Sequence, residues 1–150
     1  MNNANNLIRY TKFATVVFIV LAVLADALGF IIVPYIVRVW ADKTDAFSMV
    51  ALSVVYYLGS VGAFVVLISF YRLLGNMGKD IVFDVKNTKL MKIIAVTCFL
   101  MGADCVVGTI AWFGTIYVGV ICFFMAMVIL CVRTVFEKAI EMKNDLDLTI

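Results

Sequence analysis

The chain of 150 residues contains no histidine. This absence removes the general base of serine-hydrolase triads and the commonest metal ligand of proteins. A phosphate-binding glycine loop is also missing, because Gly75 and Gly78 lack its spacing and its Lys-Ser/Thr ending. We therefore expect no enzyme activity, no metal site and no cofactor.

Charged residues are scarce as well, at 15% of the chain against 65% hydrophobic residues. This apolar share exceeds that of soluble domains, and the basic charge is too sparse for direct binding of nucleic acid. Crossing a bilayer takes about 20 apolar residues, and such spans must be helical. The sequence predicts one all-α membrane domain, a four-helix bundle over residues 1–150, with spans at about 13–37, 47–71, 91–112 and 117–136, a loop at 72–90 and a tail at 137–150.

The distribution of the basic residues predicts the orientation. All lysines and arginines except Arg38 and Lys43 lie in three segments, 9–12, 72–92 and 133–143, which flank the predicted spans at one side of the membrane. Basic residues mark the cytoplasmic side of short loops. We expect both termini in the cytoplasm, a retained first span and a multi-pass protein of a bacterial cytoplasmic membrane.

The helix ends carry local signals. The one proline, Pro34, lacks a backbone donor and is expected to interrupt the first helix. Gly75 and Gly78 predict the end of the second helix, with glycine in the left-handed conformation. Asp84 is a suitable N-cap for a helix that begins at Val85.

Two acidic residues, Asp26 and Asp104, lie inside predicted spans. An acid at membrane depth indicates proton or cation handling, or sensing of a cationic ligand. The favoured interpretation is a protonated carboxyl bonded to a neighbouring helix, because buried polar groups commonly serve helix association. Gly59 and Ala63 share one helix face, and Gly108 lies on the face of Asp104, so we expect these three residues to serve helix packing.

Cysteine occurs four times, at residues 98, 105, 122 and 131. Folding the last two spans about residue 114 sets Cys98 level with Cys131 and Cys105 level with Cys122. Cys122 and Cys131 are nine residues apart and face opposite sides of one helix, which excludes a single four-thiolate site. We interpret the cysteines as small buried apolar residues.

Two segments carry a family resemblance. In the first, Gly78 and Phe83 precede Asn87, a leucine and the third span; the second is the ending Asp-Leu-Asp-Leu-Thr-Ile at 145–150. Over its whole length the chain resembles a bacterial four-span membrane family catalogued as domain of unknown function 2975. Members of that family are often encoded beside a small helix-turn-helix regulator of the Cro/C1 type, and the family often has serine at the position of Asp84. The resemblance implies a membrane-bound regulator of a transcription factor and transfers no catalytic residue.

The basic, cytoplasmic segments are the best candidates for partner contact. Their predicted partner-binding residues are Phe83, Asn87, Lys89, Leu146, Leu148 and Ile150. The alternation of leucine and polar residues after residue 145 favours an extended strand that adds to a sheet edge or enters a groove. Lysines at 86, 89 and 92 share one helix side and suit anionic headgroups or an acidic partner. The alternative is a solvated connector with a frayed terminus.

Three functions remain open from the sequence. The first is a regulatory binding protein that sequesters or modulates a small helix-turn-helix regulator at the membrane. The second is an immunity or stress protein against a bacteriocin-like peptide, in which the outer Asp42 and Asp45 contribute. The third is a small proton or ion transporter that uses Asp26 and Asp104. The expected partners are the lipid bilayer, such a regulator and a second copy of the chain.

Overall fold

The computed structural model describes residues 2–42, 45–79 and 81–148. Its elements follow in the order α1 (Asn2–Ala27), α2 (Gly29–Tyr35), the π-helical turn η1 (Ile36–Trp40), α3 (Ala46–Met77), α4 (Val85–Gly108) and α5 (Thr115–Leu148). Four of these helices, α1, α3, α4 and α5, are long and apolar enough to cross a membrane. The predicted all-α, four-span architecture is confirmed, and the chain is a multi-pass membrane protein.

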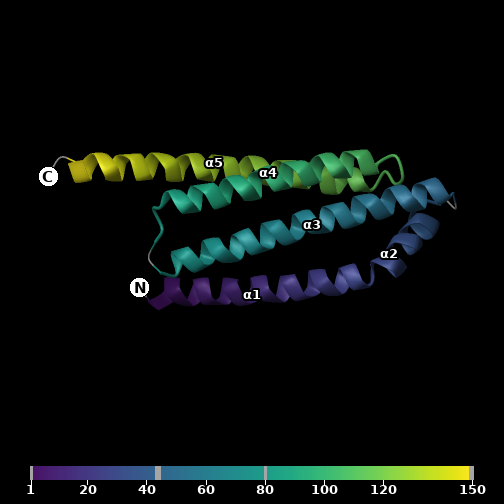
Figure 1. The fold of residues 1–150 in the computed structure, drawn as a ribbon, viewed down its shortest axis with the longest axis horizontal. Helices are drawn as coiled ribbons and strands as arrows, with labels where there is room; N and C mark the ends of the chain where they lie inside the picture. Colours follow the sequence, from purple (N-terminus) through teal and green to yellow (C-terminus); the bar gives the residue numbers. More distant parts are fainter. Residues whose placement is uncertain (1, 43–44, 80, 149–150) are drawn as a thin grey trace.

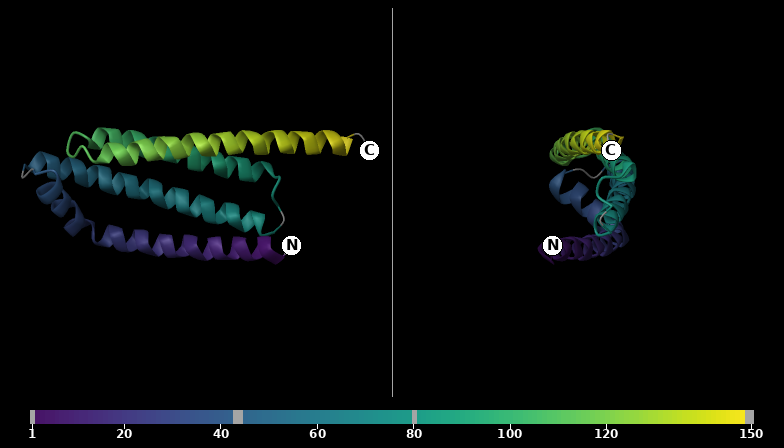
Figure 2. Two further views of the ribbon diagram at one scale, coloured as in Figure 1. Left: turned by 180° about the vertical axis from the view of Figure 1, so that it is seen from behind. Right: turned by 90° about the vertical axis from the view of Figure 1, so that its left-hand side faces the viewer.

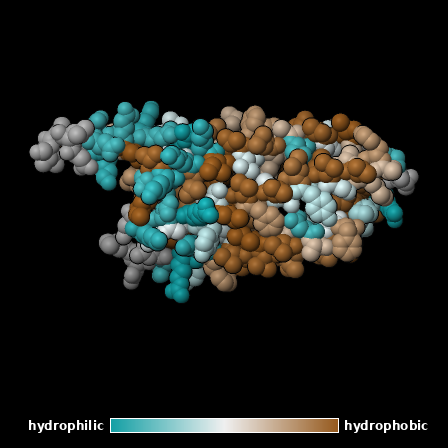
Figure 3. Space-filling view, in the orientation of Figure 1, coloured by the Kyte–Doolittle hydropathy of each residue, from teal (hydrophilic) through white to brown (hydrophobic). Residues whose placement is uncertain are grey.

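The long helices pack in chain order and form an open arc. Helix α1 packs on α3, α3 on α4, and α4 on α5, whereas within the described ranges α1 meets neither α4 nor α5. The end-on view in Figure 2 shows this arc. Both termini lie at the same end of the molecule (Figure 1). Hydrophilic residues gather at that end and a broad apolar band follows it (Figure 3). We call the end formed by residues 6–12, 72–79, 81–92 and 133–146 the basic end.

The first helix bends at Leu28, six residues before the proline that was expected to break it. Pro34 lies inside α2. At the bend, the Ala25 carbonyl accepts hydrogen bonds from Leu28 N (3.2 Å) and from Tyr56 Oη of α3 (2.8 Å). Gly29 allows this approach, because a Cβ there would lie 2.8 Å from Tyr57 Oη. A contact with α3 therefore sets the position of the bend.

A small apolar core lies at the end opposite the basic end. After the bend, α2 and η1 lean onto the start of α3 and the turn between α4 and α5. This places Val33 and Val37 against Leu52 and Ala111, all of them buried. The π-helical turn is closed by the hydrogen bond from Ala41 N to the Ile36 carbonyl (3.0 Å). The segment after Pro34 is thus a packed cap over the end of the helices.

At the basic end the helices run further than the sequence suggested. Helix α3 continues through Gly75, and Gly78 has φ −70°, so the predicted left-handed glycine is wrong. Asp84 caps α4 as expected, since its Oδ1 accepts from Lys86 N at 2.7 Å. The link between α3 and α4 therefore shrinks from the predicted loop at 72–90 to residues 78–84.

The C-terminal segment is helical where an extended strand was expected. Helix α5 includes residues 146–148, so the strand prediction is wrong there. Ile150 lies outside the described residues. The alternation of leucine and aspartate is short, and a helix that is already 30 residues long continues through it because each added residue gains a backbone hydrogen bond.

Candidate functional site

The last part of α5 projects beyond the other helices at the basic end, as Figures 1 and 2 show. Its apolar residues recur at alternating spacings of four and three and so share one helix face. From the end of the predicted span into the projecting part these are Val135, Ala139, Met142 and Leu146, which we call the α5 stripe. Val135, Met142 and Leu146 are 66%, 61% and 67% exposed. Met142 and Leu146 lie beyond the predicted span, and large apolar side chains so exposed there indicate a contact surface.

The short α3–α4 link leans against the base of this projecting segment. The rings of Phe83 and Phe136 lie 5.9 Å apart, and Phe83 remains half exposed. Leu146 follows Phe136 by ten residues, which is about 15 Å along the helix. Of the predicted partner-binding residues, Phe83 and Leu146 therefore belong to one surface, at its base and near its tip.

Asn87 was expected to contact a partner, but the structure places its side chain inside the protein. Its side chain is fully buried. The Nδ2 atom donates to the Ile81 carbonyl (2.7 Å) and to the Val82 carbonyl (2.9 Å), while Oδ1 accepts from Asn76 Nδ2 (2.8 Å). Because these bonds occupy both amide hydrogens and the oxygen, Asn87 holds the link in place and has no free group for a partner.

The remaining predicted contact residues do not join this surface as a group. Lys89 is exposed, but it lines a separate cavity that also includes Lys12 of α1. Leu148 is the last residue of α5. At the opposite end, Asp45 caps α3 by accepting from Ser48 N (2.8 Å), and Asp42 has a positive φ of 49°. Asp45 thus has a structural role whatever else it contacts.

The two intramembrane acids approach α3 at consecutive residues. Asp26 of α1 accepts a hydrogen bond from Ser60 Oγ at 3.0 Å. Asp104 of α4 faces Gly59, where an added Cβ would lie 3.6 Å from its Oδ2. That Oδ2 is buried and has no hydrogen-bond partner among the described residues. The acids therefore lie at one level of the molecule, against different faces of α3, because consecutive helical residues point about 100° apart.

The small residues expected to serve packing lie between α3 and its neighbours. An added Cβ at Gly108 would lie 3.0 Å from Val55 Cγ1 of α3, and Gly59 makes room for Asp104. Ala63 lines an apolar cavity of about 550 Å³ between α3, α4 and α5. A closer approach occurs at Gly119, where an added Cβ would lie 3.1 Å from the Gly102 carbonyl oxygen. Glycine thus allows α4 and α5 to approach to backbone contact.

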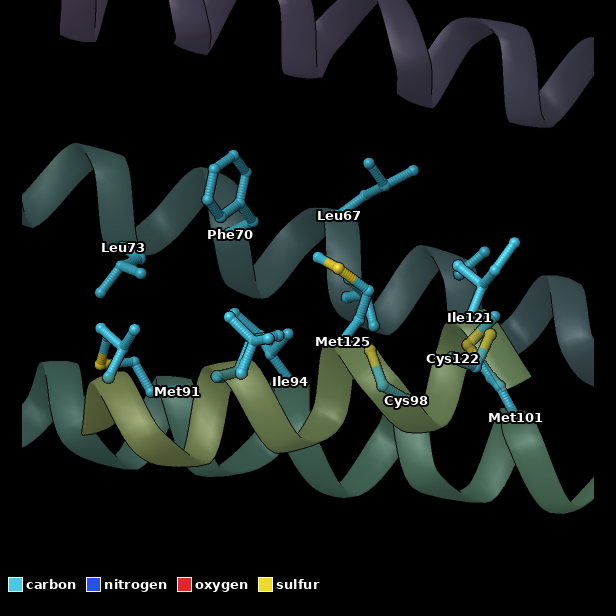
Figure 4. A pocket seen from close by; sticks show the side chains of 15 residues that line it. Leu67, Phe70, Leu73, Met91, Ile94, Cys98, Met101, Ile121, Cys122 and Met125 are labelled. Carbon is cyan, nitrogen blue, oxygen red and sulfur yellow. The ribbon is translucent and has the colours of Figure 1, made fainter. Parts of the chain in front are cut away.

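Two of the four cysteines line the apolar cavity between α3, α4 and α5 (Figure 4). Cys98 and Cys122 line it together and Cys131 does not line it, so the structure does not set Cys98 beside Cys131 as expected. The reason is that α4 ends at Gly108 and α5 begins at Thr115, which places the centre of the reversal before residue 114. All four thiols are free. A lining of apolar and sulfur-bearing side chains has no group that binds a polar substrate.

Comparison with known proteins gives one match. A family model described as "Protein of unknown function (DUF2975)" matches residues 9–150. The chain belongs to this family. No curated protein and no solved structure matches it. The DUF2975 match extends from residue 9, within α1, to the end of the chain, so it includes the acids, the α3–α4 link and the α5 stripe.

Sequence reasoning missed the α5 stripe although its signal is present. The spacing of four and three begins inside the predicted span with Val128 and Val132 and continues without interruption to Leu146. Because residues after 145 were expected to form a strand, the helical spacing of four and three was not followed to Leu146. By contrast, no sequence signal indicates that Asp26 and Asp104 meet α3 at neighbouring residues, because this depends on how α1 and α4 are aligned along α3.

Proposed function

We propose that this DUF2975 protein is a regulatory binding protein that holds a soluble partner at the cytoplasmic face of the membrane. The partner class that we propose is a small helix-turn-helix transcription regulator. One observation carries the proposal, namely the exposed α5 stripe on a helix whose last part projects beyond the other helices (Figure 1).

The stripe suits a helical partner. Positions spaced by four and three form a seam that packs against another helix, with side chains of one helix inserting between those of the other. Met142 lies near the middle of the seam, and methionine adapts to irregular partner surfaces. Charged residues such as Glu141 and Lys143 flank the stripe and supply the polar rim of an interface.

The direction of the projecting helix supports a cytosolic partner. Lys138 and Lys143 follow the fourth span closely, and basic residues next to spans remain on the cytoplasmic side. The other segments of the basic end contribute Arg72 and Lys79 to the same side. A small helix-turn-helix protein is itself helical and so offers a helix that can pack against such a seam.

Co-purification with the helix-turn-helix protein encoded nearest to the gene tests the proposal. We expect wild-type membranes to retain that protein, and Met142→Glu to weaken retention at least tenfold, because a charge without a partner is costly in an apolar seam. Asn144→Glu is the matched control, since it adds the same charge about 200° away around α5. Equal retention by wild type and Met142→Glu would exclude docking on the stripe.

The oligomeric state tests whether a second copy of the chain, and not a regulator, packs against the α5 stripe. If the stripe joins two copies of the chain, Met142→Glu converts a dimer into a monomer in light scattering while Asn144→Glu does not. That result contradicts docking of a regulator on this surface. We expect the mass of the purified chain to be the same for both variants.

The base of the surface gives a second test. Phe83→Ala removes the ring that packs on Phe136, and we expect it to weaken retention of the partner by about 3- to 10-fold. Phe113→Ala is the control, because Phe113 is also an exposed ring beside another aromatic residue, Tyr117 at 6.5 Å, but lies at the opposite end. A larger loss with Phe113→Ala would place the partner at that end instead.

Proton or cation handling is a second candidate, favoured by the buried Oδ2 of Asp104, which has no hydrogen-bond partner among the described residues. A carboxyl at membrane depth that lacks a partner is suited to take up a proton or a cation. We expect proteoliposomes that carry this activity to lose it with Asp104→Asn and to keep it with Met142→Glu. The regulatory proposal predicts the reverse dependence for retention of the partner.

A further inference from the structure

A cavity of about 460 Å³ lies at the basic end, between α1, α3, the α3–α4 link and α4. Five of its lining residues are cationic, namely Lys12, Arg72, Lys79, Lys86 and Lys89. They come from four separate segments of the chain. None of the lining residues in the described part of the chain is acidic.

Within the described ranges, none of these cations forms an ion pair. The one ion pair between described residues joins Arg133 and Glu137 on α5. Lys12 lies over the ring of Tyr71, with Nζ 5.0 Å from the ring centroid, and it packs beside Gly75. Several like charges around one cavity repel each other unless an anion neutralises them. The arrangement therefore has the electrostatics of an anion site before any ligand is bound.

The lining and the depth of the cavity indicate which class of anion fits it. Tyr71 and Leu90 line it beside the cations, and in the sequence they stand where the predicted spans 47–71 and 91–112 meet the basic segment between them. Phosphate groups of lipids lie at this depth, and lysine and arginine are their usual ligands. The volume lies within the range of small-molecule sites and exceeds what a simple inorganic ion requires.

We propose that this cavity binds the phosphate group of an anionic ligand, with an anionic phospholipid headgroup as the source that its depth favours. Such a ligand joins Lys12 of α1 to Lys86 and Lys89 of α4, two helices that have no direct contact in the described ranges. The bound ligand therefore closes the basic end of the arc. Either orientation of the chain keeps this end at a membrane surface, so the site is independent of the proposed regulatory role.

Native mass spectrometry and thermal unfolding of the full-length chain in neutral detergent test the site. The probes are phosphatidylglycerol, phosphatidylcholine and inorganic phosphate. We expect phosphatidylglycerol to bind and to raise the Tm, because a ligand that binds the folded state stabilises it. The double variant Lys86→Gln/Lys89→Gln is expected to bind about 25-fold more weakly, at about fivefold for each removed cation.

The matched control is Lys138→Gln/Lys143→Gln, which removes the same charge from exposed positions on α5 outside the cavity. Unchanged Tm values of both double variants without lipid exclude a folding defect. If Lys86→Gln/Lys89→Gln unfolds, Arg72→Gln provides an independent test of the loss of binding.

Competition by inorganic phosphate against phosphatidylglycerol would support a soluble phosphate compound as the ligand, and failure to compete would support the lipid headgroup. Equal binding of phosphatidylglycerol and phosphatidylcholine without binding of phosphate, or equal losses in both double variants, would overturn the proposal.

Discussion

At the scale of single residues, Asn87 determines the shape of the α3–α4 link. Its amide makes three hydrogen bonds from a fully buried position. Asn87→Ala leaves the Ile81 and Val82 carbonyls without this donor, and each such loss costs about 1 kcal/mol or more. We expect the free energy of unfolding to fall by about 2–3 kcal/mol, measured by thermal unfolding in detergent. Asn144→Ala, at an exposed position, should leave it unchanged, and a similar fall in that control would contradict the assignment.

Asp104 is the residue whose replacement we expect to increase stability. Its buried Oδ2 lacks a partner among the described residues, so the folded state bears an uncompensated desolvation cost. The surrounding side chains, such as Leu58 and Val61, are apolar and line a cavity of about 530 Å³ with it. Asp104→Leu is therefore expected to stabilise the chain by about 1–3 kcal/mol in the same unfolding measurement.

Asp26→Leu serves as the comparison, because Asp26 accepts a hydrogen bond from Ser60. Bonds of this kind between membrane helices contribute about 0.6 kcal/mol on average, so a small loss is expected. A fall in stability with Asp104→Leu as large as that with Asp26→Leu would mean that Asp104 has a bound partner, such as a water molecule or a cation.

At the scale of elements, the contact of α4 with α5 depends on paired glycines. An added Cβ at Gly119 meets the Gly102 carbonyl oxygen at 3.1 Å, and backbone cannot move aside as a flexible side chain can. We expect Gly119→Leu to cost about 1–3 kcal/mol through overpacking. Ala103→Leu adds a comparable side chain at an exposed position of α4 and should be neutral. Equal effects of the two changes would contradict close packing at Gly119.

The elements also show which local signals are reliable. The apolar runs predicted the long helices, and Asp84 predicted where α4 begins, because span length and capping are local properties. The position of the bend depends on Tyr56 and Tyr57 of α3, so the sequence around Pro34 does not reveal it. Gly78 stays right-handed because its N–H bonds to the Leu74 carbonyl at 3.0 Å, within a continuing turn of helix.

At the scale of the whole molecule, the arc of helices α1, α3, α4 and α5 explains which features of the candidate site could be predicted from the sequence. Exposure that depends on one segment, such as that of Phe83 and Leu146, could be expected from the sequence, and their contact with a partner stays a prediction. The basic cavity and the pair of acids each combine residues from helices far apart in the chain, and their assembly depends on the order α1, α3, α4, α5 around the arc. The burial of Asn87 could not be predicted for the same reason, since its partner Asn76 belongs to a different helix, α3.

The orientation of the basic end is the central claim, because the proposed partner contact requires this end to lie in the cytoplasm. Labelling of single cysteines, introduced into a chain without its native cysteines, tests it in intact cells. With Lys89→Cys and Lys143→Cys we expect labelling by a membrane-impermeant maleimide only after the membrane is permeabilised. With Asp42→Cys and Phe113→Cys, at the opposite end, we expect labelling from outside. Labelling of Lys89→Cys or Lys143→Cys in intact cells, with protection of Asp42→Cys, would contradict the orientation and exclude a cytosolic regulator as the partner.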